Sequence, residues 1–159
     1  MALIFTCTEH VLGQKEDRNW VFGHGAGIDF NDLNNPMTFT HPSTGGFETA
    51  ASISDENGNL ILYNGALDSI SQEFYLFNRN GDIIKNSKIA HEGTFAKGSV
   101  ILKKPGSDSQ YYVFYTGLHT DSLCSPPRDP CFGLFYCIVD MYLNNNEGEV
   151  IIKDELVIQ

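Results

Sequence analysis

Three aspartates are the residues whose type and spacing could carry out chemistry. Asp29 lies inside an apolar run, and Asp55 and Asp140 each follow one. Two carboxylates at a defined separation can hydrolyse a glycosidic bond, one as the acid and the other as base or nucleophile. Aspartate is also typical of strand ends, because its side chain accepts hydrogen bonds from the backbone of a turn. We favour the turn interpretation and keep the carboxylate pair as the alternative.

Other motifs for metals, nucleotides or nucleophiles fail on their spacing. The run from Asp55 to Asn59 resembles half of a calcium loop, but the twelfth position is Ala66, where such a loop needs Glu. His24 and His119 have no Gly-x-Ser-x-Gly nucleophile motif to serve, and no phosphate-binding glycine motif occurs. The sequence therefore predicts no metal, no cofactor and no catalytic residue.

In an oxidising compartment, two of the four cysteines are expected to form a disulfide. Cys124 and Cys131 bracket the proline-rich loop Ser-Pro-Pro-Arg-Asp-Pro, and two cysteines that close a short stiff loop favour a disulfide. A metal site is the weaker alternative, because no second cysteine pair is present. Cys137 lies in an apolar run and is expected to be a buried free thiol.

Aromatic side chains are the better candidates for binding. Tyr and Trp favour interfaces, since they combine an apolar ring with a polar group. We take Trp20, Tyr75, Tyr111 and Tyr136 as weak binding candidates. Alternation along strands should turn about half of the aromatic residues into the core instead.

Charge narrows the class of partner. The formal net charge of the 159 residues is −10, which argues against binding to nucleic acid or to anionic membrane surfaces. The chain has no apolar run of 18 residues, so no membrane-spanning helix is expected.

The elements that would position these residues are short strands in two similar stretches. One runs from Ser52 to Lys85 with turns at Asn57-Gly58 and Asn80-Gly81. The other runs from Val100 to Lys153 with turns at Pro105-Gly106 and near Gly148, and it carries an insertion at 118–130. We predict a two-residue type I′ turn at Asn57-Gly58.

This pattern predicts an all-β fold of β-propeller-like, four-stranded antiparallel blades in an incomplete ring. Residues 1–18 form an N-terminal segment, interpreted as a degenerate signal peptide or an edge strand. A partial propeller domain follows at 19–159, with a partial blade at 19–46 and full blades at 47–95 and 96–159. Small residues at 50–54 suit an innermost strand.

A set of motifs resembles one family. They are Asn19-Trp-Val-Phe-Gly23, Ala26-Gly-Ile-Asp-Phe-Asn31, Ala51-Ser-Ile-Ser-Asp55, Lys104-Pro-Gly106 and Val139-Asp-Met141. Together they resemble the N-terminal region of large exported surface proteins of bacteria with a type IX secretion system, many of them associated with gliding motility. Members of that family carry more blades and a C-terminal sorting domain, which this chain does not show.

The resemblance implies an exported, extracellular or cell-surface β-propeller without catalytic residues. We therefore expect a non-catalytic binding or structural module that contacts a protein or a surface glycan. The alternative is a fragment of a propeller-type glycan-active hydrolase that uses Asp29, Asp55 or Asp140. Open blade edges also predict that two chains could pair as a homodimer.

Overall fold

The computed structural model describes residues 15–43, 50–67, 73–89, 98–119 and 131–158. Over these residues the chain forms β-strands and two short 3-10 turns. The all-β prediction is confirmed, because the clusters of Val, Ile, Tyr and Phe between turn residues do form strands. None of the helical segments in these ranges has the length and apolar character that crossing a membrane requires.

The strands form three antiparallel sheets that follow one another along the chain. The first sheet contains β1 to β3, the second β4 to β6, and the third has the order β10-β9-β8-β7. The bounds are β1 Asn19–Val21, β2 Ala26–Asp29, β3 Met37–Thr40, β4 Ser52–Ser54, β5 Leu60–Ala66, β6 Phe74–Asn78, β7 Ser99–Lys103, β8 Gln110–His119, β9 Cys131–Asp140 and β10 Glu149–Ile158.

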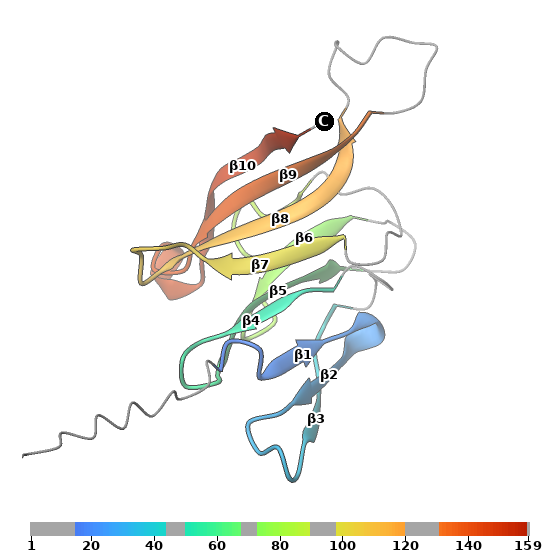
Figure 1. The fold of residues 1–159 in the computed structure, drawn as a ribbon, viewed down its shortest axis with the longest axis vertical. Helices are drawn as coiled ribbons and strands as arrows, with labels where there is room; N and C mark the ends of the chain where they lie inside the picture. Colours follow the sequence, from blue (N-terminus) through green and yellow to red (C-terminus); the bar gives the residue numbers. More distant parts are fainter. Residues whose placement is uncertain (1–14, 44–49, 68–72, 90–97, 120–130, 159) are drawn as a thin grey trace, which may run out of the picture.

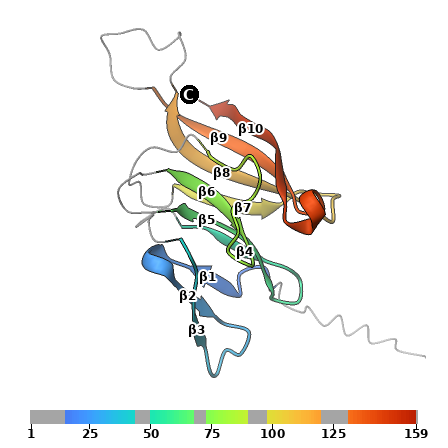
Figure 2. The ribbon, with the colours of Figure 1, turned by 180° about the vertical axis from the view of Figure 1, so that it is seen from behind.

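The second sheet lies between the other two (Figures 1 and 2). Its first strand, β4, contacts the first strand of each neighbour, β1 and β7. The sheets do not close into a ring over the described residues, so the structure supports stacked antiparallel sheets and leaves the propeller as a proposal.

Two apolar clusters hold the stack together. The larger one joins one face of the second sheet, which includes Leu62 and Leu76, to the inner face of the third, which includes Val113 and Val139. The smaller one joins the opposite face of the second sheet to the first sheet. Its buried members are Val21, Tyr63 and Phe77. Because successive side chains on a strand point to opposite faces, the second sheet is covered on both sides.

Buried asparagines connect neighbouring sheets. Asn19 Nδ2 on β1 donates to Ser54 Oγ at 3.0 Å and to the Gly58 carbonyl at 2.7 Å, both in the second sheet. Asn64 Nδ2 on β5 donates to Ser99 Oγ on β7 at 2.8 Å. A buried amide must find partners, so these bonds restrict how one sheet can lie on the next.

The hairpin at Asn57-Gly58 differs from the predicted type I′ turn. The Gly58 N–H donates to the Asp55 carbonyl at 2.9 Å, and the Asp55 N–H donates to the Asn59 carbonyl at 2.8 Å. Only Gly58 has a positive φ, +89°, and Asn57 does not. This is a type I turn followed by a left-handed glycine, the usual three-residue hairpin. The prediction failed because Asn-Gly is compatible with both turns, and the Asp55 cap favours the longer one.

The predicted strand at 82–85 is also only partly formed. This segment pairs with β6 through isolated bridges such as Phe77 with Ile83, and the Ile84 N–H donates to the Leu76 carbonyl at 2.9 Å. On its other side, the Lys85 carbonyl accepts the Val150 N–H of β10 at 3.0 Å. The segment therefore joins the second sheet to the third. The predicted insertion loop is shorter than 118–130, since β8 extends to His119.

Candidate functional site

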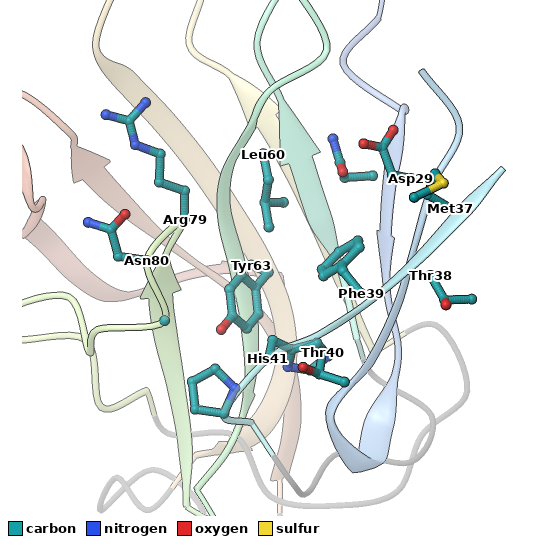
Figure 3. A pocket seen from close by; sticks show the side chains of 13 residues that line it. Asp29, Met37, Thr38, Phe39, Thr40, His41, Leu60, Tyr63, Arg79 and Asn80 are labelled. Carbon is teal, nitrogen blue, oxygen red and sulfur yellow. The ribbon is translucent and has the colours of Figure 1, made fainter. Parts of the chain in front are cut away.

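A cavity of about 470 Å³ lies between the first and second sheets (Figure 3). The first sheet contributes side chains from β3 and the residues that follow it, and the second contributes β5 and the turn after β6. Its lining includes Asp29, Phe39, His41, Leu60, Tyr63, Arg79 and Asn80. The volume is within the range of small-molecule sites, roughly 300–1,000 Å³.

Strand register directs β3 toward this cavity. Phe39 pairs with Gly27 on β2 and lies on the same face, packed against the cluster that contains Tyr63. A Cβ atom at Gly27 would lie 2.3 Å from Phe39 Cζ, so the glycine provides the room for the ring. The alternation that places Phe39 inward places Thr38 and Thr40 on the opposite side of the strand, although both also border the cavity.

Tyr63 is the most unusual residue of the site. Its ring is stacked on Phe77 with centroids 5.2 Å apart and meets the His41 ring edge-on at 5.1 Å. The residue is 1% exposed, and its hydroxyl has no hydrogen-bond partner among the described residues. Burial, together with the charge of Asp82, raises the pKa of Tyr63 to about 12. A buried hydroxyl left without a partner costs about 1–3 kcal/mol.

His41 also has one ring nitrogen without a partner. Its Nε2 lies 2.9 Å from the Ala26 carbonyl and 3.1 Å from the Phe22 carbonyl. Both are acceptors, so we assign the proton to Nε2, and in this tautomer Nδ1 is an acceptor. Nδ1 is buried and finds no partner within the described part of the chain.

The three aspartates lie in different sheets and accept backbone hydrogen bonds. Asp29 Oδ1 accepts the Asn31 N–H at 2.7 Å, and Asp140 Oδ1 accepts the Tyr142 N–H at 3.1 Å. Asp55 Oδ1 accepts two N–H groups, both at 2.8 Å. This geometry is the one that the turn interpretation expects, and it assigns none of the three to a paired-carboxylate site.

Two of these carboxyl groups are biased toward the ionised form. For Asp55, partial burial acts to raise the pKa, but hydrogen bonds from the side chain and backbone of Asn59 and from nearby N–H groups outweigh it and lower the pKa. For Asp140, burial is likewise outweighed, chiefly by the hydrogen bond from Gln110, and the pKa is lowered. A general acid needs a raised pKa, so neither group is prepared for that role.

The four aromatic candidates separate by exposure. Trp20 is exposed, and Tyr136 is half-buried on the outer face of the third sheet. Tyr75 is half-buried, with its hydroxyl donating to Glu73 at 2.7 Å. Tyr111 is 5% exposed inside the larger core cluster, so its ring packs in the core and is not part of the surface. Alternation turned Tyr111 inward and its neighbour Tyr112 outward.

The outer side of the third sheet is apolar and is not packed against another of the described sheets. We call this surface the free face of the third sheet. Its side chains come from β7, β8 and β9 and form an aromatic cluster with two exposed aliphatic neighbours: Val100, Leu102, Tyr112, Phe114 and Tyr136. The strand pairs Val100 with Phe114 and Phe114 with Tyr136 align them in one row.

The first sheet has a similar surface at the other end of the stack. Trp20 and Phe22 on its outer side are 51% and 42% exposed, and the Trp20 ring meets Phe30 edge-on with centroids 5.1 Å apart. We call Trp20, Phe22 and Phe30 the free face of the first sheet. The stack thus carries an aromatic surface at both ends.

The remaining candidates from the sequence are the cysteines, His119 and possible metal ligands. Cys137 is a buried free thiol, as predicted, and burial raises its pKa to about 12. The disulfide between Cys124 and Cys131 involves side chains outside the described residues and stays a prediction, and the side chain of His119 lies outside them too. Within the described ranges, no group of three or more His, Cys, Asp or Glu residues is arranged to hold a metal ion.

Sequence reasoning missed the cavity. It did not select His41, and it counted Tyr63 only as one of many tyrosines. The signal that was available is modest: His41-Pro42 directly follows a strand, where the chain must leave the sheet. The cavity itself forms between two sheets, and the sequence of a single segment does not predict how one sheet packs on another.

None of the protein family models, curated proteins or solved structures with which the chain was compared matches it.

Proposed function

We propose that this chain is a non-catalytic interaction module of an exported cell-surface protein, in which antiparallel sheets stack in the manner of propeller blades. Export is supported by the motif resemblance around Trp20 and Asp55. The absence of a catalytic role is supported by the turn contacts of the three aspartates. The interaction surface of the module is the free face of the third sheet.

One comparison within the chain carries this proposal. Leu62 on β5 pairs with Asn78, and Phe114 on β8 pairs with Tyr136, so the two residues hold the same place in their sheets. Leu62 is 0% exposed because the third sheet covers it. Phe114 points to the corresponding side of the third sheet, which no described sheet covers. The free face is thus the counterpart of a face that a sheet already covers.

The occupant we propose is a second copy of the chain. The free face of the first sheet offers Trp20, Phe22 and Phe30, and aromatic side chains are enriched at the centres of interfaces. Contact between one chain's first sheet and another's third sheet is head-to-tail. Such contacts close into a ring when the rotation permits. Two copies of three sheets would supply six sheets, within the roughly four to eight blades of closed propellers.

Light scattering over a dilution series tests this proposal. We expect a mass of twice the chain's 17.7 kDa at micromolar concentration, falling toward one chain on dilution. Phe114→Glu places a charge in the middle of the free face, and we expect it to give a monomer with an unchanged circular dichroism spectrum. Ile83→Glu is the control, because Ile83 is 45% exposed on the second sheet, away from both free faces.

Two results would overturn the proposal. The first is a folded wild-type monomer at every concentration up to about 100 μM, which would leave the free face without its partner. The second is a dimer that survives Phe114→Glu, which would place the contact elsewhere on the molecule.

A further inference from the structure

The cavity between the first and second sheets contains polar atoms that the protein leaves unpaired. The Tyr63 hydroxyl and His41 Nδ1 are both buried and lack a hydrogen-bond partner among the described residues, and both residues line the cavity. In Figure 3 the Tyr63 ring directs its hydroxyl toward the side where Asn80 lies. Buried polar groups almost always have a partner, so an unpaired hydroxyl and an unpaired ring nitrogen on two residues that line one cavity indicate a ligand that bonds to both.

A second tyrosine, Tyr115, holds the equivalent position in the third sheet and has a hydrogen-bond partner for its hydroxyl. Tyr115 pairs with Phe135 and stacks on it, just as Tyr63 pairs with Phe77 and stacks on it. The two tyrosines are equally buried, at 1% exposed. The Tyr115 hydroxyl donates to the Asp154 carboxylate, whereas Tyr63 has no such partner. The difference between them is the cavity.

The other lining groups define the chemistry of the ligand. Arg79 and Asn80 offer donors at the mouth, and the Asp29 carboxylate has acceptor capacity beyond its bond to Asn31. Phe39 and Leu60 supply an apolar wall. The lining carries one positive and one negative group, Arg79 and Asp29, so a ligand with a single charge would be repelled by one of them. A neutral ligand with many hydroxyl groups and an apolar ring face satisfies the whole set.

We propose that this cavity binds a sugar residue of a glycan. The Tyr63 hydroxyl and His41 Nδ1 bond to the sugar hydroxyls, and Phe39 packs on the face of the sugar that carries C–H groups. The site does not rest on the stacking function proposed above. Its residues lie on the opposite side of the second sheet from the third, so binding here does not require a second copy.

The test is isothermal titration calorimetry with glucose, galactose, mannose and N-acetylglucosamine, and with inorganic phosphate as the anionic alternative. We expect at least one sugar to bind in the millimolar range and phosphate not to bind. Tyr63→Phe should weaken the sugar about tenfold, the equivalent of one lost hydrogen bond. Tyr115→Phe is the matched control and should leave the sugar affinity unchanged.

Thermal unfolding separates the two tyrosines without any ligand. Tyr63→Phe removes a hydroxyl with no partner, so its melting temperature should stay the same or rise. Tyr115→Phe breaks the bond to Asp154, so its melting temperature should fall. Asn80→Ala, in an exposed turn at the cavity mouth, is a second binding variant that leaves the core intact and should also weaken the sugar.

Three outcomes would overturn this inference. Binding of phosphate without binding of any sugar would mean an anion site. A loss of stability in Tyr63→Phe as large as in Tyr115→Phe would mean that the hydroxyl already has a partner. No binding of any probe to the wild-type protein would mean that the cavity holds only solvent.

Discussion

Asp55 and Asn78 cap their hairpins in the same way. Asp55 Oδ1 accepts the N–H groups of Asn57 and Asn59, and Asn78 Oδ1 accepts those of Asn80 and Asp82, each two and four residues further on. One cap is charged and the other is neutral. The chain therefore uses one geometry in both hairpins of the second sheet, and only the Asp55 cap depends on pH.

The Asp55 cap gives a prediction for pH and stability. Asp55→Ala should lower the free energy of unfolding by about 1–2 kcal/mol at pH 7, because several hydrogen bonds to a carboxylate are lost at a partly exposed site. The folded-state pKa of Asp55 is lowered below 3.8. Its stabilisation is therefore complete above the unfolded-state pKa and is lost as the pH falls through the folded-state value.

Urea denaturation at pH 7 and at pH 3 checks this prediction. The matched control is Asp55→Asn, which keeps an acceptor oxygen, as Asn78 does, and removes the charge. We expect the difference between wild-type and Asp55→Asn to shrink from pH 7 to pH 3. A difference that stays constant over this range would contradict the lowered pKa.

The hairpin that Asp55 caps also links the first two sheets. The Gly58 carbonyl accepts Asn19 Nδ2 at 2.7 Å and Asn31 Nδ2 at 2.8 Å, both from the first sheet. A Cβ atom at Gly58 would lie 1.9 Å from Asn31 Oδ1. The turn thus requires glycine at position 58 for two reasons: the left-handed φ of +89° and the close approach of Asn31.

Replacement of two glycines separates these requirements. Gly106 has a φ of +75° and no atom within 4 Å of its Cβ position. Gly106→Ala should therefore lower the free energy of unfolding only through the strained backbone, by about 1 kcal/mol. Gly58→Ala adds the clash with Asn31 and should cost about 2–4 kcal/mol. Urea midpoints of both variants measure the difference. Equal losses would mean that the asparagine moves aside freely and that the link between the sheets is loose.

The elements were more predictable than the contacts between them. Runs of β-branched and aromatic residues located the strands, because that pattern depends on local preference and alternation. Alternation shows that successive side chains face opposite sides of a strand, but it does not show which of the two sides faces the core. Tyr111 was therefore chosen as a binding residue, although Tyr112 is the residue that points outward. The cavity around Tyr63 and His41 depends on how two sheets meet, and that arrangement is set by contacts between residues far apart in sequence, such as Asn19 and Gly58.

The whole molecule combines aromatic end faces with a strongly acidic surface. A net charge of −10 makes two copies repel each other, while burial of the two free faces favours their contact. Salt screens the first effect, since the Debye length falls from about 10 Å at 0.1 M to about 3 Å at 1 M. Salt does not remove the second effect. Added salt should therefore weaken the repulsion between two copies and leave the apolar attraction in place.

Association of this chain should therefore tighten with ionic strength. We expect the dissociation constant of the dimer to fall by roughly threefold or more between 0.1 M and 1 M sodium chloride, measured by sedimentation velocity. Phe114→Glu should stay monomeric at both salt concentrations, because it removes the apolar contact and adds charge. An association that weakens with salt would instead mean that opposite charges carry it, and the aromatic faces would then not be the surfaces that meet.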